Sequence, residues 1–223
     1  MKSDEIKELI LREKLVAIFR HVPVEQMSEG AKALVRGGVR ALEITFDQQA
    51  EDPLETFRMA FDTVRTAVGG ALCLGAGTVL TEEQVRCASE AGAAFIVAPN
   101  TNRKIIAETK RLDMVSVPGA MTPTEIAAAW DDGADIVKLF PADDLGYHYI
   151  WNLRGPLPHI PLMVSGGVNT ETIPKFFCHG ASVVSTGVSI MDRSLLEQGN
   201  FQGIEVLARA HVDAVHTAQT KDN

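Results

Sequence analysis

The sequence has few of the features that mark secreted, membrane or nucleic-acid-binding proteins. Only three of its 223 residues are cysteine, an odd number without a CxxC pair, which argues against a disulfide framework and favours a reducing cytoplasm. No apolar run is long enough to span a bilayer, and the opening segment is charged. No basic block stands out against the net charge of −8. Neither nucleic acid nor a membrane is therefore expected as a partner.

Histidine is also sparse where metal chemistry would need it. The six histidines form no HxH or HxxxH pair, which are spacings that zinc sites use. We therefore expect no metal site, and we interpret the histidines as solvated surface residues. They are His21, His148, His159, His179, His211 and His216.

Hydrophobic residues make up 46% of the chain, which is enough for one substantial core. Short apolar runs alternate with longer amphipathic ones, a pattern typical of βαβ units and a parallel sheet. Eight strands are predicted, at 15–19, 41–46, 72–77, 94–99, 114–119, 136–141, 162–166 and 183–187. Helices are predicted at 4–13, 25–36, 53–67, 82–90, 103–111, 123–132, 145–153 and 170–178.

Eight such units indicate closure into a single-domain (β/α)8 TIM barrel, residues 1–223, with an extra helix at the N-terminus. A weak repeat supports this count, because a glycine followed by a small residue ends every second helix, at Gly38, Gly92, Gly133 and Gly180. The chain after Ala214 is polar and is expected to fray.

Lys138 lies in the middle of the apolar run 134–143, where a charged side chain requires a structural or functional explanation. Side chains alternate along a strand, so Lys138 shares a face with Ile136 and Phe140. Lysine is rarely buried unless it is paired or used. Burial disfavours the ammonium form and lowers the pKa of the amine, which can then attack a carbonyl group to form a Schiff base.

Other polar residues fall where strands end, which is where barrels carry their chemistry. Glu43 and Thr45 share the face of the second strand opposite Leu42 and Ile44, so we predict that Glu43 points inward with Lys138. A purely structural Glu43–Lys138 ion pair is the alternative, although desolvation usually cancels the attraction within such a pair. Arg20, Thr78, Pro99 and Asn100 end further strands.

The last two strands end in the glycine-containing segments 165–167 and 185–189. Barrels commonly build a phosphate site from the backbone N–H groups of these two loops. Glycines here could instead serve tight turns alone, but their position on the seventh and eighth strands favours phosphate binding.

These segments resemble, in order and spacing, the 2-dehydro-3-deoxy-phosphogluconate (KDPG/KHG) aldolases, including the phosphogalactonate aldolases. No single segment is decisive, but together they span nearly the whole chain. They are VAIFR at 16–20, LEIT at 42–45, GAGTVL at 75–80, PGAMTP at 118–123, VKLFPA at 137–142, LRGPLPHIPLM at 153–163 and SGGV at 165–168.

The resemblance implies a class I aldolase that cleaves a phosphorylated 2-keto-3-deoxy sugar acid to pyruvate and glyceraldehyde 3-phosphate. It implies no metal or other cofactor, and a homotrimer. Lys138 matches the Schiff-base lysine and Glu43 matches the general acid/base. The residues that match substrate-binding positions are Arg20, Thr78, Pro99, Phe140, Gly166, Gly167, Gly187 and Val188.

One departure concerns the sugar acid. Many phosphogluconate-specific members carry an arginine four residues after the catalytic glutamate, where this chain has Asp47. Arg20 resembles a first-strand arginine of other members, including the galactonate branch, and could supply the missing positive charge. Phosphogluconate is the first expectation, and phosphogalactonate or another 2-keto acid is the alternative. A phosphosugar isomerase or epimerase, or a non-catalytic phosphosugar-binding barrel, also stays open.

Overall fold

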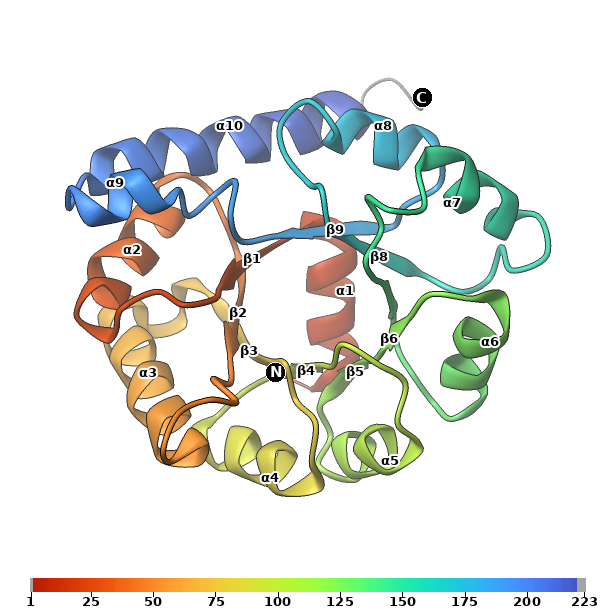
Figure 1. Cartoon of the computed structure of the whole chain (residues 1–223), viewed down its shortest axis with the longest axis horizontal. Helices are drawn as coiled ribbons and strands as arrows, with labels where there is room; N and C mark the ends of the chain where they lie inside the picture. The colour runs from red at the N-terminus through yellow and green to blue at the C-terminus, as the bar shows by residue number, and fades with distance from the viewer. Residues whose placement is uncertain (1, 220–223) are drawn as a thin grey trace.

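The computed structural model describes residues 2–219 and shows a closed barrel of parallel strands inside a ring of helices (Figure 1). The strand order is β5-β4-β3-β2-β1-β9-β8-β7-β6, so the ends of the sheet, β5 and β6, are neighbours in the chain. The strands are β1 Leu15–Phe19, β2 Ala41–Thr45, β3 Cys73–Gly77, β4 Phe95–Val97, β5 Val115–Val117, β6 Gly119–Ala120, β7 Val137–Leu139, β8 Leu162–Ser165 and β9 Val183–Thr186. The predicted (β/α)8 barrel is confirmed.

The predicted fifth strand is divided in two by Pro118. Proline has no N–H group for a ladder hydrogen bond, so the strand is interrupted at this residue. The carbonyl group of Pro118 still accepts a hydrogen bond from the N–H of Lys138, at 2.8 Å. β5 pairs with β4 and β6 pairs with β7, so one interrupted strand completes the circle.

The helices that surround the barrel match the predicted ones, with shifts at several ends. Thr81 and Thr122 cap α4 and α6 through their side chains. All four glycines of the repeat have φ between 98° and 101°, a conformation that glycine adopts without strain. The helices are α1 Ser3–Glu13, α2 Val24–Arg36, α3 Pro53–Val68, α4 Glu82–Ala91, α5 Arg103–Arg111, α6 Pro123–Asp131, α7 Tyr147–Arg154 and α8 Ile173–Cys178, with a short 3-10 helix at Gly69–Ala71.

The end of the chain differs from the prediction. Two helices follow β9, α9 Arg193–Glu197 and α10 Phe201–Gln219, and neither is among the predicted elements. α10 continues through the segment that is expected to fray, because Val215 and Ala218 are buried. The expectation of fraying after Ala214 is therefore wrong as far as Gln219, and residues 220–223 lie outside the described part.

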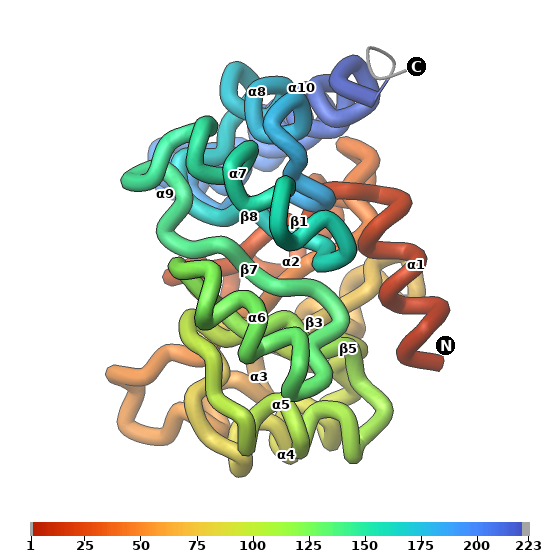
Figure 2. Tube along the Cα trace, turned by 90° about the vertical axis from the view of Figure 1, so that its right-hand side faces the viewer, coloured from red at the N-terminus to blue at the C-terminus, as the bar shows by residue number. Residues whose placement is uncertain are grey.

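The core has two layers, one inside the barrel and one between the strands and the helices. Ile136 belongs to the inner layer and Val137 and Leu139 to the outer one, as the alternation predicts. Helix α1 adds Ile6 and Ile10 to the inner layer, and it crosses the centre of the barrel in Figure 1. Figure 2 shows α1 on one side of the barrel, at the end where the strands begin. The opposite end remains for a site.

Within residues 2–219 no helix has the combination of length and apolarity needed to cross a membrane. The same part of the chain has no group of three or more histidine, cysteine, aspartate or glutamate residues that could hold a metal ion.

Candidate active site

Lys138 of β7 and Glu43 of β2 both point into the barrel. Their exposed fractions are 4% and 0%, and each shares the inward face of its strand with an apolar residue of the inner layer, Ile136 and Ala41 respectively. Neither carboxylate oxygen of Glu43 has a hydrogen-bond partner in the described part of the chain. Buried carboxylates are normally hydrogen-bonded, so this one is available to a reacting group.

Burial dominates the ionisation of both groups. Desolvation raises the pKa of Glu43, against the opposing effects of Lys138 and Arg20. Desolvation lowers the pKa of Lys138, and the charge of Glu43 opposes this while that of Arg20 adds to it. Compared with the same groups in water, the neutral form of the Lys138 amine and the neutral form of the Glu43 acid are therefore both favoured over their charged forms. An amine in this state can attack a carbonyl group, and an acid in this state can donate a proton.

Glycines make room for this pair. A Cβ atom on Gly77 would lie 1.9 Å from Oε1 of Glu43, so only glycine at this position of β3 permits the observed carboxylate position. On the side of Lys138, Gly119 is its partner in the β6–β7 register, and a Cβ there would lie 2.3 Å from the carbonyl group of Pro99. Pro99 thus contacts the strand beside Lys138.

Phe140 lies two residues beyond Lys138 and covers its amine. The Nζ atom of Lys138 is 5.0 Å from the centre of the Phe140 ring, within the range of a cation–π contact. The phenylalanine is 37% exposed, so it forms part of the wall between the amine and solvent.

Arg20 and Thr78 meet at the ends of β1 and β3. An Nη2 atom of Arg20 donates to Oγ1 of Thr78 at 3.0 Å, and Gln48 donates from Nε2 to the carbonyl group of Thr78 at 2.8 Å. Thr78 has φ 56°, which is rare for a β-branched residue and is a form of strain found at functional sites. Asp47 is exposed and lines the same pocket as Arg20 and Thr78.

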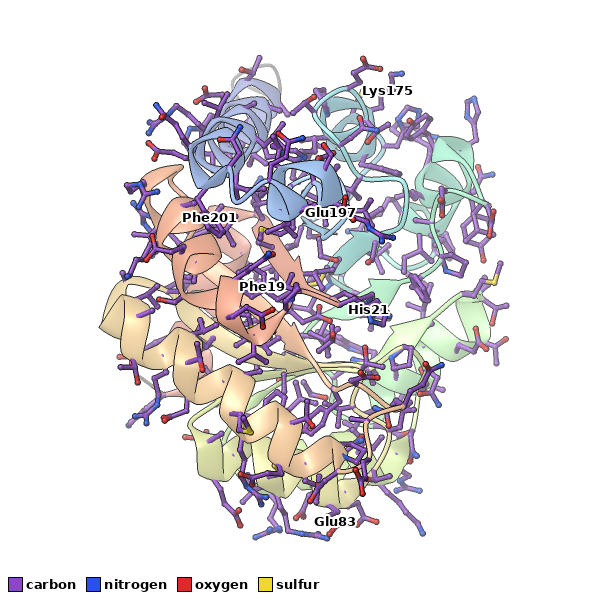
Figure 3. All side chains as sticks on the ribbon, turned by 60° about the vertical axis from the view of Figure 1, so that its left-hand side comes forward. Phe19, His21, Glu83, Lys175, Glu197 and Phe201 are labelled. Atoms are coloured by element: carbon purple, nitrogen blue, oxygen red, sulfur yellow. The ribbon has the colours of Figure 1, made fainter. Side chains whose placement is uncertain are left out.

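The loops after β8 and β9 surround a cavity of about 840 Å³. Gly166, Gly167, Gly187 and Val188 all line it, together with Arg20. His21 and Glu197, labelled in Figure 3, line it from the loop after β1 and from α9. The structure therefore brings five of the predicted substrate-binding residues to one cavity.

Two buried serines lie between this cavity and the barrel interior. The sequence prediction gave them no individual role. Ser165 and Ser185 are partners in the β8–β9 register, both are at least 96% buried, and both line the cavity. The Oγ atom of Ser185 has no hydrogen-bond partner among the described residues. Its even spacing from Val183, an inner-layer residue, is the sequence signal that could have revealed it.

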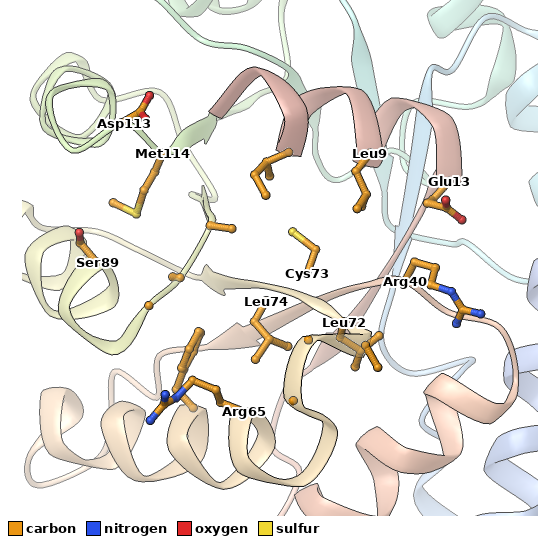
Figure 4. A pocket seen from close by; sticks show the side chains of 18 of the residues that line it. Leu9, Glu13, Arg40, Arg65, Leu72, Cys73, Leu74, Ser89, Asp113 and Met114 are labelled. Carbon is orange, nitrogen blue, oxygen red and sulfur yellow. The ribbon is translucent and has the colours of Figure 1, made fainter. Parts of the chain in front are cut away.

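A second pocket, of about 720 Å³, lies at the opposite end of the barrel against α1 (Figure 4). Leu9, Cys73 and Met114 contribute to its lining, and Arg40 and Arg65 come from neighbouring elements. None of the predicted site residues lines this pocket.

The fold and the inward-facing residues define a class. This is a (β/α)8 barrel whose interior holds a desolvated lysine beside a buried carboxylate, at the end of the strands where barrel enzymes react. Such a lysine can serve as a nucleophile toward carbonyl compounds.

Comparisons with known proteins specify the family. The family model of KDPG and KHG aldolase matches residues 6–207. A probable 2-dehydro-3-deoxy-6-phosphogalactonate aldolase of Rhizobium meliloti is 32% identical over 206 residues, covering 92% of this chain and 94% of that protein. A 2-dehydro-3-deoxy-phosphogluconate aldolase of Treponema pallidum is 28% identical over 211 residues, covering 94% of this chain and 97% of that protein. A solved structure described as native KDPGal has a TM-score of 0.80 at 28% identity, covering 92% and 96%.

The chain belongs to the KDPG and KHG aldolase family. Its relatives are named as aldolases, which are lyases, and the resemblance read from the sequence is confirmed.

Proposed function

We propose that this aldolase cleaves a 2-keto-3-deoxy-6-phospho sugar acid to pyruvate and glyceraldehyde 3-phosphate through a Schiff base on Lys138. The observation that carries the proposal is the burial of Lys138 and Glu43 on the inner face of one barrel, where desolvation stabilises their uncharged forms. The amine attacks the C2 keto carbon to give a carbinolamine, which loses water to become a protonated imine.

Glu43 moves the protons in this sequence. It donates a proton to the departing hydroxyl group of the carbinolamine and then, as a carboxylate, takes the proton of the C4 hydroxyl group. The C3–C4 bond breaks, its electron pair passes to C3 and the imine becomes a neutral enamine. Glyceraldehyde 3-phosphate leaves, C3 is protonated, and water hydrolyses the pyruvyl imine. The imine is the electron sink, so the reaction needs neither a metal nor another cofactor.

The two ends of the substrate fit two different parts of the site. Arg20 and Thr78 supply a guanidinium group and a hydroxyl group for the substrate carboxylate. Backbone N–H groups at Gly166, Gly167, Gly187 and Val188 bind the phosphate, as these loops commonly do in barrels. Pro99 lies against Gly119, the register partner of Lys138, and the centre of the Phe140 ring lies 5.0 Å from the Lys138 amine, so both can contact a substrate bound there.

The sugar acid is most directly 2-dehydro-3-deoxy-6-phosphogluconate. The galactonate epimer is the second candidate. Asp47 occupies the position of the arginine common in phosphogluconate-specific members. Arg20, which resembles an arginine of the galactonate branch, contacts Thr78 and can supply the positive charge instead. Comparing kcat/KM for the two epimers decides between them. The more rapidly cleaved epimer identifies the substrate.

Borohydride trapping tests the mechanism. Incubation with pyruvate and borohydride should add a reduced pyruvyl group to Lys138, detected by intact mass and peptide mapping. Lys138→Met should not be labelled, whereas Lys104→Met, which removes an exposed lysine, should be labelled like the wild type. Folded wild-type protein that gains no adduct would overturn the Schiff base. It would then favour an isomerase or a phosphosugar-binding protein.

We also propose that the enzyme is a cytoplasmic homotrimer. Cys73, Cys87 and Cys178 are all free, which suits a reducing compartment.

Trp151 of α7 is 62% exposed, and the neighbouring Tyr149 donates to the carbonyl group of Met121, itself an exposed apolar residue. Exposed aromatic residues of this kind are enriched at subunit contacts.

A further inference from the structure

His211 of α10 is buried, contrary to the expectation that the histidines are solvated, and it contacts the loop after β9. It is 2% exposed, its Nε2 lies 2.9 Å from Oγ of Ser189, and its Nδ1 lies 2.7 Å from the carbonyl oxygen of Leu207. Ser189 lines the cavity that the proposed phosphate loops surround. A buried histidine outside the reacting centre is therefore linked through one hydroxyl group to that cavity.

Ser189 and Thr186 tie the two loops together. The hydroxyl group of Ser189 lies 2.7 Å from the carbonyl oxygen of Val168, and that of Thr186 lies 2.9 Å from the same oxygen. The two hydroxyl oxygens are 2.7 Å apart. Val168 directly follows Gly166 and Gly167, and Thr186 and Ser189 flank Gly187 and Val188. The cluster thus joins the backbone of both glycine loops.

The number of available hydrogen atoms indicates which group donates and which accepts in this cluster. A carbonyl oxygen can only accept, so Nδ1 of His211 must carry a hydrogen atom for Leu207. Desolvation lowers the pKa of His211 and favours the neutral ring, in which Nε2 is then an acceptor. Ser189 donates its single hydroxyl hydrogen to Nε2, and Thr186 is left to donate to Val168. Each of the two hydroxyl hydrogens then has one acceptor.

We propose that His211 is a positioning residue for the phosphate end of the substrate: by accepting from Ser189 it holds the loop after β9 so that the N–H groups of both glycine loops converge on one phosphate. The inference rests on the proposed phosphate-binding role of those loops. α10 is thereby part of the site without touching the substrate. A leucine would fill the same volume but could accept nothing, and Ser189 could then turn its hydrogen to Val168 in competition with Thr186.

The test compares phosphate binding with the chemistry at Lys138. Glycerol 3-phosphate is titrated by calorimetry into the wild type, His211→Leu, His211→Gln and Ser189→Ala, and KM and kcat are measured with the phosphorylated sugar acid. His211→Leu should weaken glycerol 3-phosphate binding and raise KM about two- to thirteenfold, the range expected for one lost hydrogen bond, with kcat within about twofold. His211→Gln should restore most of the affinity, because its amide can both accept and donate.

Three controls separate positioning from general damage. His216→Leu, which changes an exposed histidine of the same helix, should bind like the wild type. Pyruvate carries no phosphate, so borohydride labelling of Lys138 should proceed at the wild-type rate in His211→Leu. If His211 acts through Ser189, the double variant His211→Leu/Ser189→Ala should be no weaker than the single variants.

Several results would overturn the inference. These are unchanged glycerol 3-phosphate affinity in His211→Leu, full additivity in the double variant, or no binding of glycerol 3-phosphate to the wild type. If His211→Leu does not fold, wild-type affinity in Ser189→Ala overturns it equally. A wild type that binds glycerol 3-phosphate but is not labelled by pyruvate would instead refute the proposed Schiff base, while the comparison of affinities still decides the role of His211.

Discussion

Gly77 faces Glu43 so closely that a methyl group on Gly77 would overlap the Glu43 carboxylate, with 1.9 Å between the Cβ and Oε1 positions. Glu43 is fully buried. The absence of a side chain at Gly77 is therefore a condition for the position of the proposed acid/base.

The first prediction follows from this contact. Gly77→Ala should displace the Glu43 carboxylate and reduce kcat roughly 10²-fold or more, because general acid–base catalysis contributes about 10²–10⁴-fold. The overlap should also lower the free energy of unfolding by about 1–3 kcal/mol. Gly70→Ala is the matched control, since a Cβ there meets nothing within 4 Å. Wild-type kcat in folded Gly77→Ala would contradict the assignment of Glu43.

The second prediction concerns pH and stability. The pKa of Glu43 is raised in the folded protein above its usual value of 4.5. Proton binding at Glu43 therefore makes its full contribution to the stability of the fold at pH values below 4.5. This contribution is lost as pH rises through the folded-state pKa. Glutamine does not titrate. The stability of Glu43→Gln relative to the wild type should therefore increase between pH 5 and pH 8, measured by urea unfolding. A constant difference across this range would show that burial does not raise the pKa.

The third prediction tests the negative charge at Asp47. Asp47 shares a pocket with Arg20 and Thr78, and its Oδ1 accepts from the N–H of Gln49, a contact that asparagine can keep. Asp47→Asn should lower KM for the anionic substrate about two- to fivefold at low ionic strength, with a smaller effect at about 0.5 M salt, where charges are screened. Asp131→Asn, on the exposed end of α6, serves as the control. Equal KM values at low salt would mean that Asp47 does not face the substrate.

The fourth prediction is that the three thiols react very differently. Burial raises the pKa of Cys73 to about 11 and also raises that of Cys87, whereas Cys178 is exposed. The thiolate is the reactive form, so iodoacetamide at pH 8 should label Cys178 first and leave Cys73 and Cys87 largely unmodified. Peptide mapping over time measures this order. Rapid labelling of Cys73 would mean that the pocket under α1 opens in solution.

The fifth prediction addresses assembly. Light scattering should give the mass of three chains, and Trp151→Glu should reduce it because a charge would replace the exposed aromatic surface of α7. Trp130→Phe is a conservative control at the tryptophan of α6, which is only partly exposed. A monomeric wild type would exclude the trimer. A trimer that persists in Trp151→Glu would place the interface elsewhere.

The sequence by itself determined the barrel and the inward direction of its two central polar residues. Strand and helix periodicities are local properties, so eight alternating units could be counted without coordinates. The same alternation put Lys138 with Ile136, and Glu43 opposite Leu42 and Ile44. In both cases the conclusion needed only neighbouring residues in the chain.

Only the tertiary structure decided which distant residues meet. The space that Gly77 leaves for Glu43 and the contact between Arg20 and Thr78 both depend on strand register around a closed barrel. His211 was misjudged for the same reason. Its helix is stabilised by packing against other elements, and its hydrogen-bond partner Ser189 lies 22 residues earlier in the chain. Local sequence patterns encode periodicity and burial, whereas contacts across the fold arise only when the barrel closes.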